Sequence, residues 1–267
     1  MLNLAKLANQ IKLEGYTQIT AEAKLCQDVI LYLISKSRFK DHITIKGGVV
    51  MRSITSDSRR ATLDLDIDLI RYPLTDEKIK SLISELDGIE GIKLTISKKI
   101  EDLKHQDYHG KRIYLDIDDS FNNHFATKID LGVHTNLSID QEEYCFDISF
   151  DENGALLLVN SKEQMFVEKI KSLLRFSFNS TRYKDIFDIF YLKDHVDLLQ
   201  LKKYFNILIF EDRNIRTKTM KEVYLSIKKT FSNEKYLKRL STSNMNWIGI
   251  DSQIVINDIL KFLKSLI

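Results

Sequence analysis

Three aspartates, Asp64, Asp66 and Asp68, alternate with leucine and isoleucine. On a β-strand, side chains two positions apart project from the same face, so the three carboxylates would lie together and repel one another unless a cation or water screens them. Mg²⁺ takes hard carboxylate oxygens, typically one or two from the protein together with substrate phosphates. The spacing therefore predicts a magnesium site on this strand. The alternative is a solvated strand face whose aspartates contact only water.

The sequence Lys46-Gly47-Gly48 precedes these aspartates and lies between a predicted strand and a predicted helix. Backbone without side chains can approach a phosphate closely, and a helix N-terminus supplies amide donors and partial positive charge. Arg60 and Thr62 follow, and the first aspartate lies sixteen residues after Gly48. A pair of glycines is a weak signal alone, but in this order it predicts a site for a nucleoside triphosphate (NTP) and its metal.

A later strand can supply a third metal-binding carboxylate. In this segment Asp130 is flanked by Ile129 and Leu131, which would face the core while the aspartate faces the metal. A second pair with the same spacing, Asp116 and Asp118, follows no glycine-rich turn. We interpret that pair as the polar face of an outer strand.

A cluster of charged residues lies in a helical segment further along the chain. Lys184 and Asp188 are four positions apart and share a helix face, and Arg182 lies one turn before Asp185. Charged groups among apolar neighbours can be an ion-paired helix edge. They can also be a cationic clamp on triphosphate oxygens, with its direction fixed by the aspartates.

The periodicity of apolar residues predicts the elements that carry these groups. Helices are expected over 2–14, 18–36, 49–54 and 75–86, and strands over 43–45, 63–70, 92–100, 112–118 and 126–134. Beyond residue 161 the pattern is helical almost to the end. We therefore predict an α+β fold in which a mixed-sheet domain with N-terminal helices, residues 1–160, is followed by a helical, basic domain, residues 161–267.

Composition narrows the class of protein. With 43% hydrophobic residues in 267, the chain can bury a large core, which excludes intrinsic disorder. Nine glycines and one proline disfavour a turn-rich all-β fold. Cys26 and Cys145 are far apart and are expected to be reduced. No segment approaches 18 consecutive apolar residues, so we expect a cytoplasmic protein with no membrane partner.

Charge is distributed unevenly along the chain. Residues 201–267 hold 13 Lys or Arg against 6 Asp or Glu, whereas residues 1–200 hold 27 against 32. A basic tail suggests a polyanionic partner such as RNA, and the alternative is a solvated helical surface. Aromatic residues of this region could stack on RNA bases or pack in a helical core, and they are Tyr191, Tyr204, Phe205, Tyr224, Phe231, Tyr236 and Trp247.

Taken in order, these motifs resemble the AbiEii/AbiGii family of nucleotidyltransferase-like toxins, and are similar to the MenT toxins. The resemblance covers about residues 40–195. It is carried by Lys46-Gly47-Gly48, Arg60-Ala-Thr62-Leu-Asp64-Leu-Asp66, Tyr108-His109-Gly110-Lys-Arg112-Ile113, Lys128-Ile-Asp130-Leu-Gly132, Glu168-Lys169 and Arg182-Tyr-Lys184-Asp185-Ile-Phe-Asp188.

The resemblance implies a polymerase-β-type nucleotidyltransferase fold, Mg²⁺, an NTP donor, and a cognate AbiEi-like antitoxin in a phage-defence system. Relatives transfer a nucleotide to the tRNA 3′ end and so block aminoacylation. By motif, Asp64 and Asp66 resemble the metal-binding pair, Lys169 the essential helix lysine, and Asp185 or Asp188 the final acid. The helical domain is then expected to complete the active-site cleft.

The sequence therefore predicts catalytic and metal-binding residues in both domains. The expected metal ligands are Asp64, Asp66 and Asp130. The expected catalytic residues are Asp64, Asp66, Lys169, Asp185 and Asp188. The expected ligands of the triphosphate are Gly47, Gly48, Arg60, Thr62, Lys169, Arg182 and Lys184.

Two alternative functions stay open at this point. One is a catalytically inactive RNA-binding or regulatory relative, and the other is an enzyme that modifies a small molecule. A zinc site is not expected, because His105 and His109 have no third ligand near them in the sequence.

Overall fold

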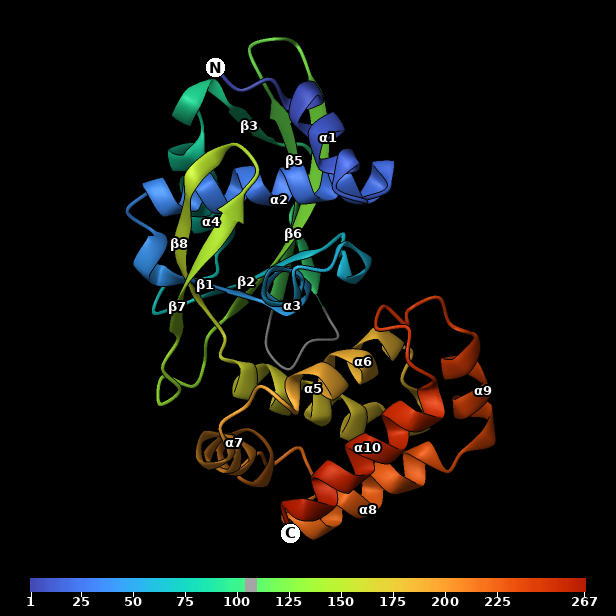
Figure 1. The fold of residues 1–267 in the computed structure, drawn as a ribbon. Helices are drawn as coiled ribbons and strands as arrows, with labels where there is room; N and C mark the ends of the chain where they lie inside the picture. The colour runs from blue at the N-terminus through green and yellow to red at the C-terminus, as the bar shows by residue number, and fades with distance from the viewer. Residues whose placement is uncertain (104–109) are drawn as a thin grey trace. The chain divides into compact units, whose positions relative to one another are not determined.

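A computed structural model describes residues 1–103 and 110–267. Two compact units divide the chain, Met1–Asn160 and Ser161–Ile267. Figure 1 shows strands in the first unit and helices throughout the second. The motif residues His105, Tyr108 and His109 lie outside the described residues.

The first unit is built on an eight-stranded mixed sheet. Its strands are β1 (Ile43–Lys46), β2 (Leu65–Leu69), β3 (Lys93–Ile96), β4 (Glu101–Leu103), β5 (Gly110–Asp118), β6 (His124–Val133), β7 (Glu142–Ile148) and β8 (Asp151–Val159). They run in the order β3-β5-β6-β2-β1-β8-β7, with β4 beside β5. The β2–β6 and β1–β8 pairs are parallel, and the other pairs are antiparallel.

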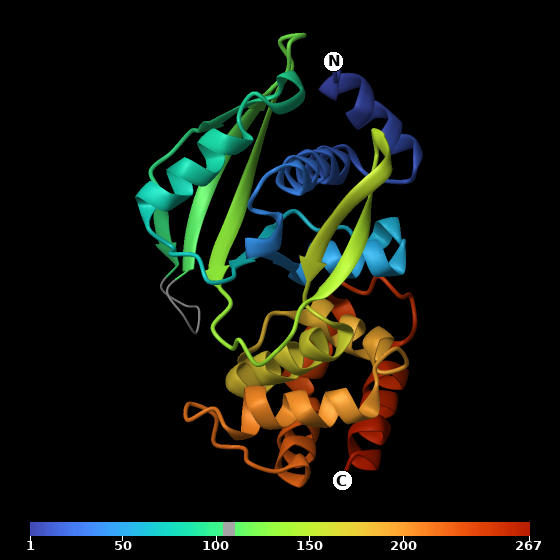
Figure 2. The ribbon, with the colours of Figure 1, turned by 90° about the vertical axis from the view of Figure 1, so that its left-hand side faces the viewer.

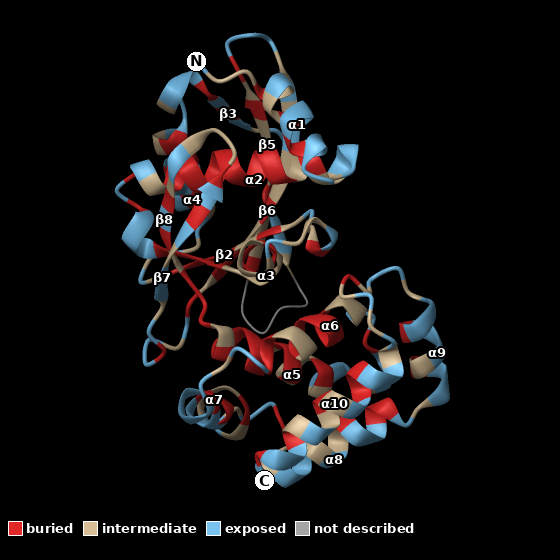
Figure 3. Cartoon of the chain, viewed as in Figure 1, coloured by how far each residue is buried: buried red, intermediate tan, exposed pale blue. Residues whose placement is uncertain are grey.

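Four α-helices accompany this sheet in the described part of the unit. They are α1 (Leu4–Leu13), α2 (Gln18–Lys36), α3 (Gly47–Thr55) and α4 (Asp76–Leu86). Helix α2 runs across the strands and packs against β6, β7 and β8, while α4 packs against β3 (Figures 1 and 2). Figure 3 shows α2 buried along much of its length, because it is enclosed by α1 and the sheet.

The two faces of the sheet differ in chemistry. On one face Ile45, Ile67 and Leu131 lie in one cross-strand row and are buried. The intervening residues of the same strands are Lys46, Asp66 and Asp130, which point to the opposite face. One apolar face and one polar face therefore explain the strict alternation of the sequence.

Side-chain caps fix where several helices begin. Thr17, Thr75 and Ser161 accept hydrogen bonds from the first-turn amides of α2, α4 and α5 (Lys162–Phe176), respectively. These bonds satisfy amides that the helix itself leaves without partners. The predicted starts of these helices agree with the observed ones to within one or two residues.

The second unit is helical throughout its described residues. After α5 come α6 (Tyr183–Leu192), α7 (Leu198–Phe205), α8 (Met220–Phe231), α9 (Glu234–Thr242) and α10 (Ser252–Ser265). Aromatic rings fill part of its core, since Phe166 packs edge-on against Phe205 and Phe262. Five of the aromatic residues considered for base stacking are buried, so for them the prediction of core packing is confirmed: Tyr204, Phe205, Phe231, Tyr236 and Trp247.

The fold corrects one sequence-based expectation and adds one element. Strand β5, which carries Asp116 and Asp118, is not an outer strand, because it pairs with β6 on one side and with β3 and β4 on the other. The β7–β8 hairpin was not predicted.

Within the described residues, no helix is both long and apolar enough to cross a bilayer.

Candidate active site

Charged residues form a continuous row across four strands of the first unit. Lys46 lies opposite Asp66 in the β1–β2 register, Asp66 lies beside Asp130 in β2–β6, and Asp130 lies opposite Arg112 in β5–β6. Register neighbours share a face, with Cβ atoms roughly 4.5–5.5 Å apart. The strand pairing therefore brings two of the sequence-predicted metal ligands together between two cations.

Asp64 and Asp68 flank this row on the same face, and each contacts a lysine. Asp64 lies one residue before β2 and pairs with Lys128 at 2.7 Å. Asp68 is buried, and its carboxylate lies 2.6 Å from the Lys46 ammonium. Asp68, which is not among the predicted metal ligands, thus pairs with a lysine of the neighbouring strand β1.

Asp130 is held in a fixed orientation by Arg112. The guanidinium donates from Nε at 2.7 Å and from Nη2 at 2.8 Å, one bond to each carboxylate oxygen. Such bidentate pairing sets the plane of the carboxylate as well as its position. The same contact raises the pKa of Arg112 above its ordinary value. The negative face is therefore ordered by adjacent cations.

Gly47 and Gly48 are required by close approaches to this face. Gly47 has φ +68°, and a Cβ there would collide with the Asp66 carboxylate. A Cβ on Gly48 would lie 2.5 Å from Oγ1 of Thr62 and 2.7 Å from its Cβ. A larger residue at either position would displace a predicted site residue. The glycine pair thus fits closely against Asp66, a predicted metal ligand, and Thr62, a predicted triphosphate ligand.

The helix that starts at these glycines has a different N-terminus from its neighbours. Lys46, the residue before α3, makes no side-chain cap, whereas Thr17 caps α2 and Thr75 caps α4. The first-turn amides of α3 lie at the positive end of the helix dipole, where an anion is stabilised. A helix start of this kind is what a phosphate-binding turn needs, and phosphate binding here stays a prediction.

Lys169 is the centre of a charged cluster inside the second unit. Its ammonium lies 2.7 Å from Asp185 and 2.9 Å from Asp188, and all three side chains are buried. Arg182 donates from Nε to Asp185 at 2.5 Å, and the Trp247 indole donates to Asp188 at 3.0 Å. The structure thus brings together the three catalytic residues predicted in this unit.

The charge state of Asp185 follows from these partners. Burial disfavours ionisation, but the charges of Lys169 and Arg182 outweigh it, and the pKa of Asp185 lies well below its usual range. The carboxylate is therefore ionised at neutral pH. It holds Lys169 in place as a buried cation and orients Arg182, whose side chain is 61% exposed.

The other predicted triphosphate ligands lie in different environments. Lys184 is half-buried on α6. Arg60 is buried at the end of a short 3₁₀ turn, Ser58–Arg60. Within the described residues, no group of three or more His, Cys, Asp or Glu side chains is arranged to hold a metal ion.

Sequence reasoning missed a set of polar residues under the site. Lys24, Gln27 and Asp28 lie on α2, and Arg52 lies on α3, all of them buried. The signal was the presence of three polar residues close together in a helix whose remaining residues are mostly apolar.

Comparison with known families draws these observations together. A family model described as "Nucleotidyl transferase AbiEii toxin, Type IV TA system" matches residues 29–241, well over half of the chain. The chain belongs to this family. The match begins within α2 and ends within α9, so it includes the aspartate strands and the Lys169 cluster. A comparison with curated proteins gives no match.

Membership settles the general class of this AbiEii toxin. It is a nucleotidyltransferase-type toxin of a type IV toxin–antitoxin system, which implies an NTP substrate and a cognate antitoxin. The α+β architecture, with a mixed sheet followed by helices, is consistent with a nucleotidyltransferase fold. The resemblance predicted from the sequence is confirmed.

Proposed function

We propose that this AbiEii toxin uses Mg²⁺ to transfer a nucleotide from an NTP to an RNA acceptor, the 3′ end of tRNA. The observation that carries the proposal is the register of Asp66 beside Asp130, with the backbone of Gly47 directly against the Asp66 carboxylate. Carboxylates suited to a metal ion and a helix N-terminus suited to a phosphate thus lie next to each other within one unit.

The donor chemistry of this face suits Mg²⁺. Asp64, Asp66 and Asp130 offer hard carboxylate oxygens on adjacent strands, and Mg²⁺ needs only one or two of them when phosphates complete its shell. When bound there, Mg²⁺ would neutralise triphosphate charge and favour ionisation of the acceptor hydroxyl. We propose Asp64 and Asp66 as its principal ligands, with Asp130 in support.

The triphosphate would be held by backbone and by cations. The first-turn amides of α3, from Gly48 onward, are donors for phosphate oxygens, and Thr62 adds a hydroxyl beside them. We propose Arg182, Lys184 and Lys169 as further ligands of phosphate oxygens, because transferred phosphoryl groups need positive charge around them. The exposed guanidinium of Arg182 can form bidentate contacts with phosphate.

The RNA acceptor is assigned to the basic second unit. A hollow of about 930 Å³ lies at the start of α9. Its lining includes three basic residues, Lys235, Lys238 and Arg239, one acidic residue, Glu234, and the exposed ring of Phe178. Lysines contact phosphate oxygens, and an exposed ring can stack on an unpaired base. NTPs and tRNA are cytoplasmic substrates, so we propose that the reaction, and its role in phage defence, belong to the cytoplasm.

Labelled nucleotides test the reaction directly. The purified protein is incubated with total tRNA, Mg²⁺ and each of the four NTPs in turn, labelled in the α-phosphate. The proposal expects label on tRNA from at least one NTP. Retained tRNA binding with no label from any NTP would favour a catalytically inactive RNA-binding protein. Label on a product of low mass would favour a small-molecule transferase.

Substitution of Asp66 tests the metal site. Asp66→Asn keeps the size of the side chain and removes one carboxylate, and we expect it to abolish transfer and toxicity while the protein stays folded. The matched control is Asp116→Asn, which makes the same change on the same face of the sheet but away from the row. Full activity of Asp66→Asn would remove this residue from the metal site.

Paired lysine substitutions test the hollow. Replacing Lys235 and Lys238 by alanine should weaken tRNA binding. The negative slope of log affinity against log salt concentration should become shallower by about 1 to 2. Replacing Lys261 and Lys264, two exposed lysines of α10, makes the same change in charge and should have a smaller effect. Equal losses in both double variants would contradict a specific role for the hollow.

A further inference from the structure

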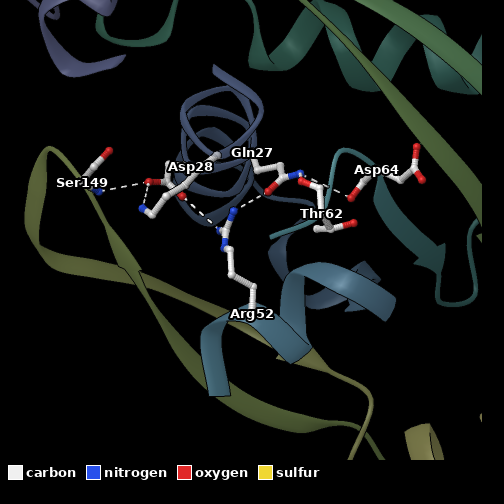
Figure 4. A network of polar contacts seen from close by, with 7 residues as sticks. Gln27, Asp28, Arg52, Thr62, Asp64 and Ser149 are labelled. Atoms are coloured by element: carbon white, nitrogen blue, oxygen red, sulfur yellow. Dashed lines mark hydrogen bonds and ion pairs between the residues drawn. The ribbon is translucent and has the colours of Figure 1, made fainter. Parts of the chain in front are cut away.

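A connected set of buried polar side chains lies beneath the aspartate strands of the first unit (Figure 4). Arg52 donates from Nη1 to Oε1 of Gln27, and its Nη2 lies 3.3 Å from Asp28. Asp28 also accepts from Lys24 at 2.6 Å and from the backbone amide of Ser149 at 3.2 Å. The exposed fractions of Gln27, Asp28 and Arg52 are 1%, 0% and 5%. Buried polar groups are costly unless paired, so each contact constrains the others.

The guanidinium of Arg52 determines how the Gln27 amide is oriented. Arg52 has only donors, so the Gln27 oxygen must face it, and this turns the amide nitrogen of Gln27 the other way. That nitrogen donates to the carbonyl oxygens of Thr62 at 3.0 Å and Asp64 at 3.4 Å. One side-chain amide therefore holds the backbone just before β2 (Figure 4).

The two residues connect both parts of the proposed site. Arg52 lies in the last turn of α3, the helix that begins at Gly47. Gln27 holds the carbonyls of Thr62, which lies against Gly48, and of Asp64, which supplies a carboxylate. Arg52 and Gln27 thus connect the helix that begins at the glycines with the segment that carries Asp64.

We propose that Gln27, oriented by Arg52, is a positioning residue that sets the spacing between the glycine turn and the Asp64 and Asp66 carboxylates. This inference rests on the proposed function, because the spacing matters only if metal and triphosphate are bound together. Gln27 is 1% exposed, so it is placed to hold the backbone and not to bind substrate or metal itself. It acts by fixing the backbone of residues 62–64, from which the carboxylates project.

The test replaces Gln27 by methionine, which has a similar shape and lacks both donor and acceptor. We expect amide hydrogen exchange in residues 61–66 to become at least tenfold faster, and the Mg²⁺ concentration for half-maximal transfer to rise at least fivefold. The control is Ile34→Val, which removes one buried methylene two turns along the same helix. It should leave both quantities within twofold of wild type, although it also lowers stability.

The outcomes separate this inference from the proposed function. Unchanged exchange in residues 61–66 of Gln27→Met overturns the positioning role whether or not the protein is active. If the wild type labels no acceptor, the proposed function fails, and faster exchange confined to residues 61–66 still supports a role for Gln27 in holding this segment. If Gln27→Met does not fold, Arg52→Lys takes its place. A lysine keeps a charge beside Asp28 but lacks the second donor group for Gln27, so the same local exchange is expected.

Discussion

Replacement of Lys169 by methionine removes the central charge of the buried cluster in the second unit and keeps the length of the side chain. In the native protein that ammonium lies 2.7 Å from Asp185 and 2.9 Å from Asp188. The variant would leave two carboxylates in an interior where Asp188 is fully buried. Arg182 still neutralises Asp185, and Trp247 still donates one hydrogen bond to Asp188.

The expected cost follows from the buried charge. Removing one partner of a buried ion pair typically destabilises a protein by about 3–5 kcal/mol. Because Arg182 is retained, we expect the lower end, about 3 kcal/mol at pH 7. With a urea m-value of about 1–3 kcal/mol per molar, the unfolding midpoint of this unit should fall by about 1–3 M.

The deficit should shrink on acidification. In the wild type, burial of Asp185 is outweighed by Lys169 and Arg182, so its folded pKa lies below the unfolded value near 3.9. Its contribution is therefore present above about pH 4 and is lost as the pH falls through the folded pKa. The variant keeps Arg182 beside Asp185 but lacks the charge of Lys169, so burial counts for more, the pKa of Asp185 rises relative to the wild type, and proton uptake relieves part of the cost. The difference between the two proteins should be smaller at pH 5 than at pH 7.

Trp247 provides the assay, because it is the single tryptophan of the sequence and contacts Asp188 directly. Its fluorescence in urea reports unfolding of the second unit specifically. The companion variant carries Asp188→Asn in addition, which removes one uncompensated charge and should recover part of the lost stability. Equal midpoints for wild type and Lys169→Met at pH 7 would refute the reasoning. They would also mean that loss of toxicity in such a variant reports chemistry alone.

Three further predictions concern the first unit. Gly48→Ala should reduce the rate of nucleotide transfer at least tenfold, because the new Cβ would lie 2.5 Å from Oγ1 of Thr62. Steady-state kinetics with the labelled NTP measure this rate. An unaltered rate would argue against the close fit of Gly48 to Thr62. Burial raises the pKa of Cys26 to about 12, so at pH 8 a thiol reagent should modify only Cys145 in the native chain. In denaturant it should modify both thiols. Rapid modification of both thiols in the native state would contradict this prediction. Chelation of divalent cations with EDTA should stop transfer, and added Mg²⁺ should restore it, whereas activity that persists in EDTA would exclude the proposed metal.

The local pattern of the sequence predicts a good part of this architecture. Strict alternation around Asp66 places the aspartates on one face, because a strand has a period of two whatever its neighbours are. The predicted bounds of α2, residues 18–36, agree with the observed helix, because its apolar residues recur at helical spacing. The β7–β8 hairpin was missed. A register shift between Phe146 and Ile148 and a glycine at position 154 interrupt its alternation.

Partners distant in sequence could not be predicted in the same way. The pairing of Arg112 with Asp130 depends on the antiparallel register of β5 and β6. The bond from Trp247 to Asp188 joins residues 59 positions apart, and the sequence pattern, although it favoured core packing for Trp247, could not name its partner. The role of Gln27 depends on α2 being enclosed on nearly all sides, which is a property of the assembled unit and not of the helix.

The ion pairs on the aspartate face also bear on how the toxin responds to its surroundings. Asp64, Asp68 and Asp130 each have a lysine or arginine of the same sheet as a neighbour. Their mutual repulsion is therefore balanced from within the polypeptide, and we expect the sheet to assemble without an inorganic ion. Magnesium starvation should accordingly silence this toxin reversibly, leaving a folded protein that regains its action when the ion returns.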